Sequence, residues 1–149
     1  MKKLICLLAL VIMVSGCATV GHLQTPSGRP EVFIEGVVLK DVTNACISVL
    51  SAKGFQIEQA SDYIVQAVHT SDSTMADFIY GSSYSHYQTF YRFIFTFSQE
   101  GNGVRVYGVQ QLIGNKGTAF ENVTPLNAQK AYEGTQSYLE AIRAKALQH

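Results

Sequence analysis

The sequence predicts an α+β domain in which an antiparallel sheet of four to five strands carries two main helices on one face. Five segments alternate apolar with polar residues or are rich in aromatic and β-branched residues, as strands are. Two longer segments, residues 41–53 and 125–148, repeat apolar residues every three or four positions, as amphipathic helices do. An Asn-Gly pair, a strong hairpin signal, separates the last two strands. The order is therefore β-α-β-β-β-β-α, in which helices group on one face of the sheet.

Residues 31–35 form the first expected strand. Val32 and Ile34 point to one face, and Glu31 and Glu35 point to the other, wetter face. The two glutamates lie about 13 Å apart along such a strand, which is too far for a pair of catalytic carboxylates. We therefore expect them at a solvated edge of the sheet.

The first expected helix starts at Asp41, whose carboxylate can cap it, and ends at Lys53. Gly54 supplies the left-handed residue that commonly follows a helix. Cys46 lies on the apolar stripe of this helix, so we expect its thiol to be buried. A redox or nucleophilic role for Cys46 is the alternative.

Four strands are expected after this helix. The longest carries aromatic residues at alternate positions on one face, which we assign to the core. These residues are Tyr91, Phe93, Phe95 and Phe97. The four strands cover residues 55–59, 63–70, 86–98 and 104–113.

A two-residue turn is expected at the Asn102-Gly103 pair, between the last two strands. This turn would set Glu100 opposite Arg105 and Phe97 opposite Gly108. An ion pair and an aromatic ring over a glycine are both favourable cross-strand arrangements.

Residues 71–85 differ from their neighbours, because small and polar residues surround one short apolar group. We expect an excursion from the sheet, with one or two helical turns that end at Gly81. Tyr80 and Tyr84 in this segment are candidate contacts for a peptide, glycan or lipid, since tyrosine combines a flat apolar ring with a polar tip.

The second helix is expected to start with Thr124 as its N-cap and Pro125 as its first residue, and to run to Gln148. Gly134 lowers its intrinsic stability by roughly 1 kcal/mol relative to alanine. An apolar stripe on this helix is expected to face the sheet. The stripe consists of Ala128, Tyr132, Thr135, Leu139, Ile142 and Ala146.

Composition and charge exclude some classes of function. Hydrophobic residues make up 47% of the 149 residues, which is enough for the core of a single globular domain. Eleven basic side chains balance eleven acidic ones, and loss of a leader with Lys2 and Lys3 would leave an acidic surplus. A broad nucleic-acid surface needs a basic surplus, so we expect no nucleic-acid partner.

The N-terminus has the features of an export signal. Lys2 and Lys3 precede an apolar run at residues 4–14. As a helix this run would measure about 16 Å, roughly half the hydrocarbon thickness of a bilayer. We therefore assign residues 1–16 to a cleaved signal peptide. Residues 17–30 are expected to form a flexible tether, and residues 31–149 a single periplasmic domain.

The residues Val14-Ser15-Gly16-Cys17 resemble the lipobox of bacterial prolipoproteins. The resemblance implies a diacylglyceryl group on the Cys17 thiol, cleavage before Cys17, and acylation of the new amino terminus. Ala18 is not the aspartate that is associated with inner-membrane retention in Gram-negative bacteria, so the implied location is the periplasmic face of the outer membrane. An ordinary secretory leader with a chance cysteine is the alternative.

Residue spacings typical of enzymes or metal sites are missing from the sequence. It contains no HxxH, HExxH or CxxC spacing among its histidines and cysteines. Apart from the covalent lipid on Cys17, we therefore expect no cofactor, no metal and no enzymatic activity. The histidines are His22, His69, His86 and His149.

The leading functional hypothesis is a non-enzymatic adaptor that binds another envelope protein or a second copy of itself. The element order resembles small helix-and-sheet domains of other envelope lipoproteins, including accessory lipoproteins of outer-membrane assembly machines. Strand alternation predicts an apolar patch on the sheet face opposite the helices, which a monomer seldom exposes without a use. The patch comprises Phe90, Ile94, Tyr107 and Val109, with Ile113 beside them and a polar rim of Arg92, Arg105, Gln111 and Thr96. The alternative is that residues 71–85 fold over this face and bury it.

A carrier of a hydrophobic small molecule or lipid is the alternative function. Its cavity would lie between the aromatic face of the sheet and the two helices. A volume above roughly 300 Å³ lined by Phe93, Phe95 and Tyr132 would favour the carrier, whereas a filled core would favour the adaptor.

Overall fold

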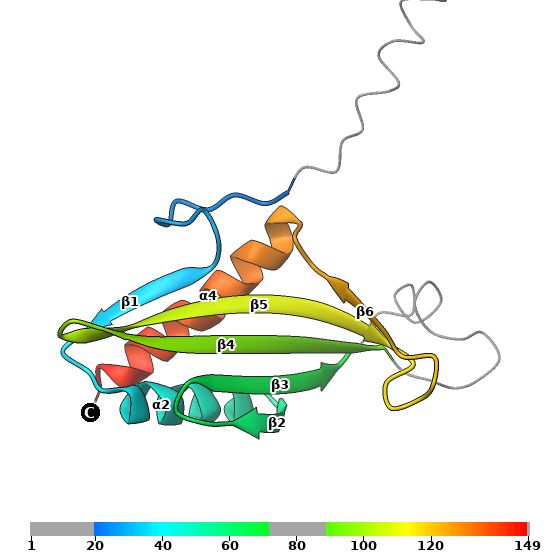
Figure 1. Ribbon diagram of the computed structural model, residues 1–149, viewed down its shortest axis with the longest axis horizontal. Helices are drawn as coiled ribbons and strands as arrows, with labels where there is room; N and C mark the ends of the chain where they lie inside the picture. The colour runs from blue at the N-terminus through cyan, green and yellow to red at the C-terminus, as the bar shows by residue number, and fades with distance from the viewer. Residues whose placement is uncertain (1–19, 72–88, 149) are drawn as a thin grey trace, which may run out of the picture.

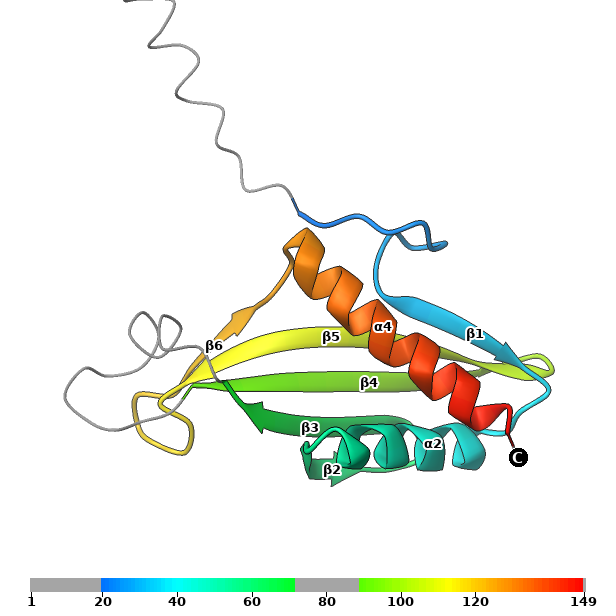
Figure 2. The same cartoon turned by 180° about the vertical axis from the view of Figure 1, so that it is seen from behind.

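The structure is a computed structural model that describes residues 20–71 and 89–148. Within these residues, two helices cover one face of a six-stranded antiparallel sheet, which confirms the predicted α+β class (Figures 1 and 2). The elements are β1 (Glu31–Glu35), α2 (Leu39–Ala52), β2 (Gln56–Ala60), β3 (Ile64–Thr70), β4 (Phe90–Glu100), β5 (Gly103–Gly114), β6 (Asn122–Pro125) and α4 (Gln129–Ala146).

The strands follow the order β1-β5-β4-β3-β2, and every neighbouring pair is antiparallel. β4 and β5 form a long central hairpin. β1 pairs with the first half of β5, and β6, which the sequence did not predict, pairs with its last residues. α4 crosses the sheet diagonally, whereas α2 lies along the side of β3 and β2 (Figure 2).

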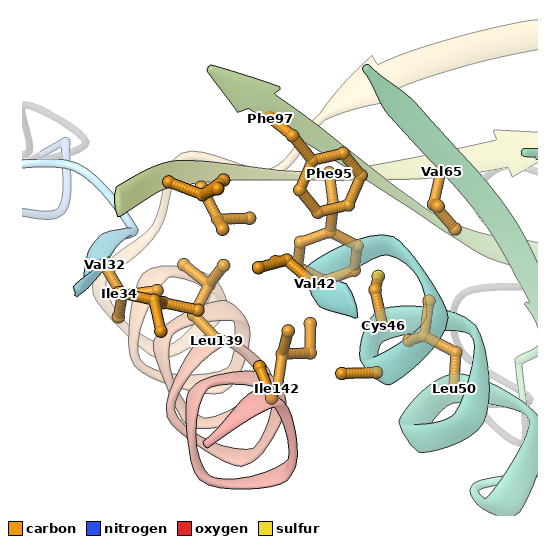
Figure 3. Close-up of a cluster of buried hydrophobic side chains, with 14 of the residues drawn as sticks. Val32, Ile34, Val42, Cys46, Leu50, Val65, Phe95, Phe97, Leu139 and Ile142 are labelled. Carbon is orange, nitrogen blue, oxygen red and sulfur yellow. The ribbon is translucent and has the colours of Figure 1, made fainter. Parts of the chain in front are cut away.

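The core lies between the helices and the inner face of the sheet. Phe93, Phe95 and Phe97 are buried, which confirms the face that the alternation assigned to the core. Figure 3 shows side chains of both helices, including Cys46 and Leu139, pointing toward Phe95 at the centre of the sheet. Complete burial of one such side chain contributes roughly 1.5–3 kcal/mol.

α2 starts earlier than predicted. Its N-cap is Val38, which makes no side-chain cap, and Asp41 lies inside the first turn. The prediction of Asp41 as the cap is therefore wrong, although a carboxylate in the first turn still interacts favourably with the positive end of the helix. The predicted end is confirmed, because Lys53 is the C-cap and Gly54 has a left-handed φ of 81°.

The turn between β4 and β5 is Gly101-Asn102, so the predicted Asn102-Gly103 turn is wrong. Glu100 pairs directly with Gly103. Gly101 has φ 57°. A positive φ at the first central residue is the pattern of a type II′ turn. Gly103 belongs to the strand and not to the turn. Glycine is required there because a Cβ at this position would collide with the carbonyl oxygen of Ile34 in β1.

The corrected register differs from the predicted one by two residues. Phe95, rather than Phe97, therefore lies opposite Gly108. Because side chains alternate with a period of two, every residue of the hairpin keeps its predicted face. Arg105 still pairs diagonally with Glu100, at 2.8 Å between Nε and Oε2.

α4 starts at Gln129, with Ala128 as its N-cap. Thr124 and Pro125 belong to β6, so their prediction as the cap and first residue of the helix is wrong. Pro125 pairs with Gln111 at the edge of the sheet, where proline is tolerated in a strand. Four members of the predicted stripe, Thr135, Leu139, Ile142 and Ala146, are buried as expected. Tyr132 is half-buried, and Ala128 is exposed and precedes the helix, so its place in the stripe is wrong.

Residues 21–30, assigned above to a tether, contact the domain. The N–H of Gly21 donates to the carbonyl oxygen of Asn127 at 2.7 Å, and the N–H of His22 donates to the side chain of Gln129 at 2.9 Å. The N–H of Gly108 donates to the carbonyl oxygen of Pro30. The folded region therefore starts before residue 31.

Glu31 is buried and does not lie at a solvated edge as predicted, whereas Glu35 is exposed. The Glu31 carboxylate accepts a hydrogen bond from the N–H of Ser27 and lies 3.5 Å from Arg105 Nη1. Burial by itself raises the pKa of Glu31, but the Ser27 hydrogen bonds and the Arg105 charge outweigh it and hold the pKa below its ordinary value. The Gln136 amide of α4 bonds both the N–H and the carbonyl oxygen of Glu31.

Candidate functional site

An open groove of about 760 Å³ lies between α4, the end of α2 and the inner face of the sheet. The two helices approach each other at one end and diverge toward the start of α4 (Figure 2). The sheet is left uncovered between the diverging ends, which is where the groove forms. Its lining consists of Lys53, Phe55, His69, Thr70, Tyr91, Phe93, Gln110, Leu126, Ala128, Lys130, Ala131, Gly134 and Tyr138.

Three aromatic rings pack edge to face at the base of the groove. The ring centroids of Phe93 and Tyr138 are 5.0 Å apart, and Phe55 lies 5.4 Å from Phe93 and 5.6 Å from Tyr138. These distances and tilted geometries are the favourable ones for aromatic pairs. Burial raises the pKa of Tyr138, because the charged phenolate is disfavoured away from water.

The end of α2 positions Phe55 in this cluster. The N–H of Gly54 bonds the carbonyl oxygen of Ser51, and the N–H of Phe55 bonds that of Leu50. This pair of bonds is a Schellman motif, which fixes the direction of the chain after the helix. The motif directs Phe55 toward β4 and α4.

Gly134 lines the groove and adds no side chain to it. A Cβ added at this position would meet no atom within 4 Å. Glycine inside a helix is unfavourable by roughly 1 kcal/mol. Packing therefore does not explain this glycine, which lines the open groove.

The rim of the groove is basic. Its basic residues are Lys53, Lys130 and His69, and no carboxylate occurs among the lining residues of the described chain. The His69 ring packs 5.1 Å from Phe55, and its Nδ1 lies 2.7 Å from the carbonyl oxygen of Thr70. A carbonyl oxygen only accepts, so Nδ1 is the donor in this contact.

The lining agrees only in part with the cavity that the carrier hypothesis required. Phe93 lines the groove, but Phe95 is fully buried beneath it. Tyr132 lines a second, smaller cavity of about 360 Å³ on the other side of α4, where the segment before β1 meets β5. Lys130, Gly134 and Tyr138 also line the groove, which the sequence did not predict. Of these three residues, Gly134 could have been noticed in the sequence, because glycine is unfavourable inside a helix.

The predicted patch on the opposite face of the sheet is only partly exposed. Tyr107 and Val109 are 37% and 47% exposed, while Phe90 and Ile94 are half-buried. Ile94 pairs with Val109, as the predicted alternation requires. Ile113 lies between Phe90 and Val123 on the predicted face of the sheet, but it is fully buried and so adds nothing to the exposed patch.

Charged side chains cross this patch at one end. Glu58 of β2 lies 2.5 Å from the Lys116 ammonium and 3.5 Å from Arg92 Nε. The Lys116 ammonium lies 5.1 Å from the centre of the Phe90 ring, which is cation–π range. Arg92 therefore belongs to an ion-pair network, and Arg105 is paired with Glu100. Neither arginine is a free polar group at the rim of the patch.

Cys46 is fully buried in the core, as predicted. Burial strongly raises the pKa of its thiol, so the reactive thiolate is suppressed. Within the described residues, no group of three potential ligands could hold a metal ion, and no helix is long and apolar enough to cross a membrane.

The positions Cys17, Tyr80 and Tyr84 lie outside the described residues. No protein-family model matches the chain, and no curated protein matches it in sequence. The groove and the outer sheet surface are the two candidate sites within the described residues.

Proposed function

We propose that this protein is a non-enzymatic envelope lipoprotein, anchored through Cys17 to the outer membrane, whose domain binds an apolar ligand in the groove. The groove volume of about 760 Å³ meets the size that the carrier hypothesis required, although only Phe93 of its three expected lining residues lines the groove. We favour the carrier over the adaptor on this volume and on the aromatic base of the groove. This volume falls within the range of roughly 300–1,000 Å³ that is usual for ligand sites.

The aromatic base of the groove is the observation that supports the proposal. Phe55, Phe93 and Tyr138 form a preformed apolar surface, and Gly134 leaves room above it. A ligand that covers this surface would remove apolar area from water at roughly 25 cal/mol per Å².

A groove-filling variant tests the proposal. We expect the neutral apolar dye N-phenyl-1-naphthylamine to shift the methyl NMR signals of Ala128 and Ala131, which line the groove, in the full chain held in lipid nanodiscs. Gly134→Leu should weaken this binding by about tenfold or more, which corresponds to about 1.4 kcal/mol. The variant should fold at least as stably as the parent, because leucine is the better helix former.

Ala144→Leu is the matched control. Residue 144 is exposed on α4 outside the groove, so this variant adds the same side chain without blocking the ligand. Equal dye binding by Gly134→Leu and the parent, or no shift of the groove methyl signals in the parent, would exclude the proposed function.

A second candidate function is the adaptor role on the outer sheet face. Its supporting observation is the exposure of Tyr107 and Val109 beside Ile94, which gives a small apolar centre on two adjacent strands. Such a surface fits another envelope protein or a second copy of this chain.

A further inference from the structure

We infer that the occupant of the groove is an anionic amphiphile from the adjacent membrane surface, with one apolar chain that ends in a carboxylate or a phosphate. This inference rests on the proposed function, because it assigns a charge and a source to the ligand of the same groove.

The charge pattern of the groove gives the sign of the ligand. Its apolar base is bordered by Lys53 and Lys130, and the described lining has no acidic side chain. Ion pairs within residues 20–71 and 89–148 use other cations, so neither lysine is neutralised by a carboxylate there. An apolar surface beside two unpaired ammonium groups is complementary to an apolar chain with an anionic head.

Lys130 lies where a helix ordinarily disfavours a positive charge. It is the second residue of α4, whose first turn contains no acidic residue. The backbone N–H groups at this end carry partial positive charge, which adds to that of the lysine. Lys53 differs, because it lies at the C-terminal end of α2, where the helix dipole by itself favours a cation. Lys130 is therefore the more informative of the two.

The attachment of the N-terminal segment points to the membrane as the source. Gly21 is hydrogen-bonded to Asn127, two residues before the start of α4. Three residues separate Cys17 from Gly21, and the four Cα–Cα steps between them span at most about 14 Å. A lipid on Cys17 would therefore hold the start of α4, and Lys130 with it, close to the bilayer surface.

A series of three dodecyl ligands tests the charge of the head group. Dodecanoate, dodecyl phosphate and dodecanol share one apolar chain and differ only in the head. We expect all three to shift the methyl signals of Ala128 and Ala131 in the full chain in nanodiscs of uncharged lipid. Both anions should bind about 3- to 10-fold more tightly than dodecanol, and this preference should fall as salt is added.

Lys53→Gln with Lys130→Gln should abolish the preference for the anions and leave dodecanol binding within about twofold. Lys40→Gln with Lys145→Gln is the matched control, because it removes the same charge from the same two helices outside the groove. A preference for only one of the two anions would identify the head group and support the inference.

The failures of the two proposals are distinguishable. If dodecanol binds as tightly as the anions, or if the Lys53 and Lys130 variant keeps the preference, the anionic assignment is wrong and the apolar groove stands. If none of the three ligands shifts the groove signals, the inference and the proposed function both fail.

Discussion

The methyl group of Thr135 in α4 lies directly over Gly108 in β5. A Cβ on residue 108 would come within 2.5 Å of Thr135 Cγ2 and 3.2 Å of the Phe95 ring. The absence of a side chain at Gly108 therefore brings α4 into close contact with the sheet at this point. Gly134, the preceding residue of α4, lines the groove, whereas Thr135 and Gly108 line the smaller cavity on the other side of the helix.

Gly108→Ala should destabilise the domain by about 1–3 kcal/mol, because the new methyl group overpacks a buried contact. Thr135→Ser in the same chain should recover part of the loss. Serine keeps the hydroxyl that donates to the carbonyl oxygen of Ala131 at 2.8 Å but lacks the colliding methyl group. Urea unfolding of both single variants and the double variant measures this coupling. Strictly additive effects would show that the two groups do not collide.

Acid should weaken the fold through Glu58. Burial raises the pKa of Glu58, but hydrogen bonds from Lys116 and Gln66 and the charges of Lys116 and Arg92 outweigh it and lower the pKa below 4.5. The ionised carboxylate therefore stabilises the folded state above that pH, and this contribution is lost as the pH falls through the lowered pKa.

Glu58→Gln should consequently cost about 1 kcal/mol at pH 7, and the difference from the parent should shrink as the pH falls below about 4.5. Unfolding free energies measured at pH 7 and pH 3.5 check this expectation. A difference that stays constant between the two pH values would mean that the ion pairs of Glu58 do not contribute to stability. Glu133→Gln, on the exposed side of α4, is the control for loss of one charge.

Cys46 should resist thiol reagents in the native protein. Its thiol is buried and its pKa is raised, so labelling requires unfolding. The labelling rate should rise in proportion to the unfolded fraction as urea is added. Asn44→Cys with Cys46→Ala places a thiol at an exposed position of the same helix and should react at once. Rapid labelling of native Cys46 would reopen a thiol function.

The faces of the strands were predictable from the sequence, whereas the turn between them was not. Alternation placed Phe93, Phe95 and Phe97 in the core, because burial of one face dictates the period of two. The Asn102-Gly103 pair misled the turn assignment, since Gly103 is required by the carbonyl oxygen of Ile34 in a distant strand. A local motif cannot reveal a tertiary contact of this kind.

The boundary of α4 and the groove depend on similar long-range contacts. Thr124 and Pro125 have the local features of a helix start, but pairing with the end of β5 recruits them into β6 instead. The groove exists because α2 and α4 diverge, and this angle is set by contacts such as that of Thr135 with Gly108. The sequence contains the groove residues but not the angle that brings them together.

The proposed lipid anchor on Cys17 predicts the behaviour of a variant that lacks this thiol. Cys17→Ser should leave an unprocessed precursor or a released periplasmic protein, because no thiol remains to accept the diacylglyceryl group. Labelling with radioactive palmitate and fractionation of the envelope measure both outcomes. A variant that lacks lipid yet stays with the outer membrane would show that Cys17 is not the anchor.

The outer sheet face gives the last prediction, because its residues differ in exposure. Val109 is 47% exposed, so Val109→Glu should fold with an unchanged melting temperature. Phe90→Glu should instead destabilise the domain, since the half-buried Phe90 ring packs under the Lys116 ammonium. If this face binds a partner or a second copy, a photo-crosslinker at residue 107 should give a defined adduct in cells. Val109→Glu should abolish this adduct, because a buried, unpaired carboxylate is costly in an interface. Asn44→Glu, on α2, adds the same charge away from the sheet and should leave the adduct intact. An adduct that survives Val109→Glu, or no adduct at all, would exclude this face as a docking surface and leave the groove as the candidate site.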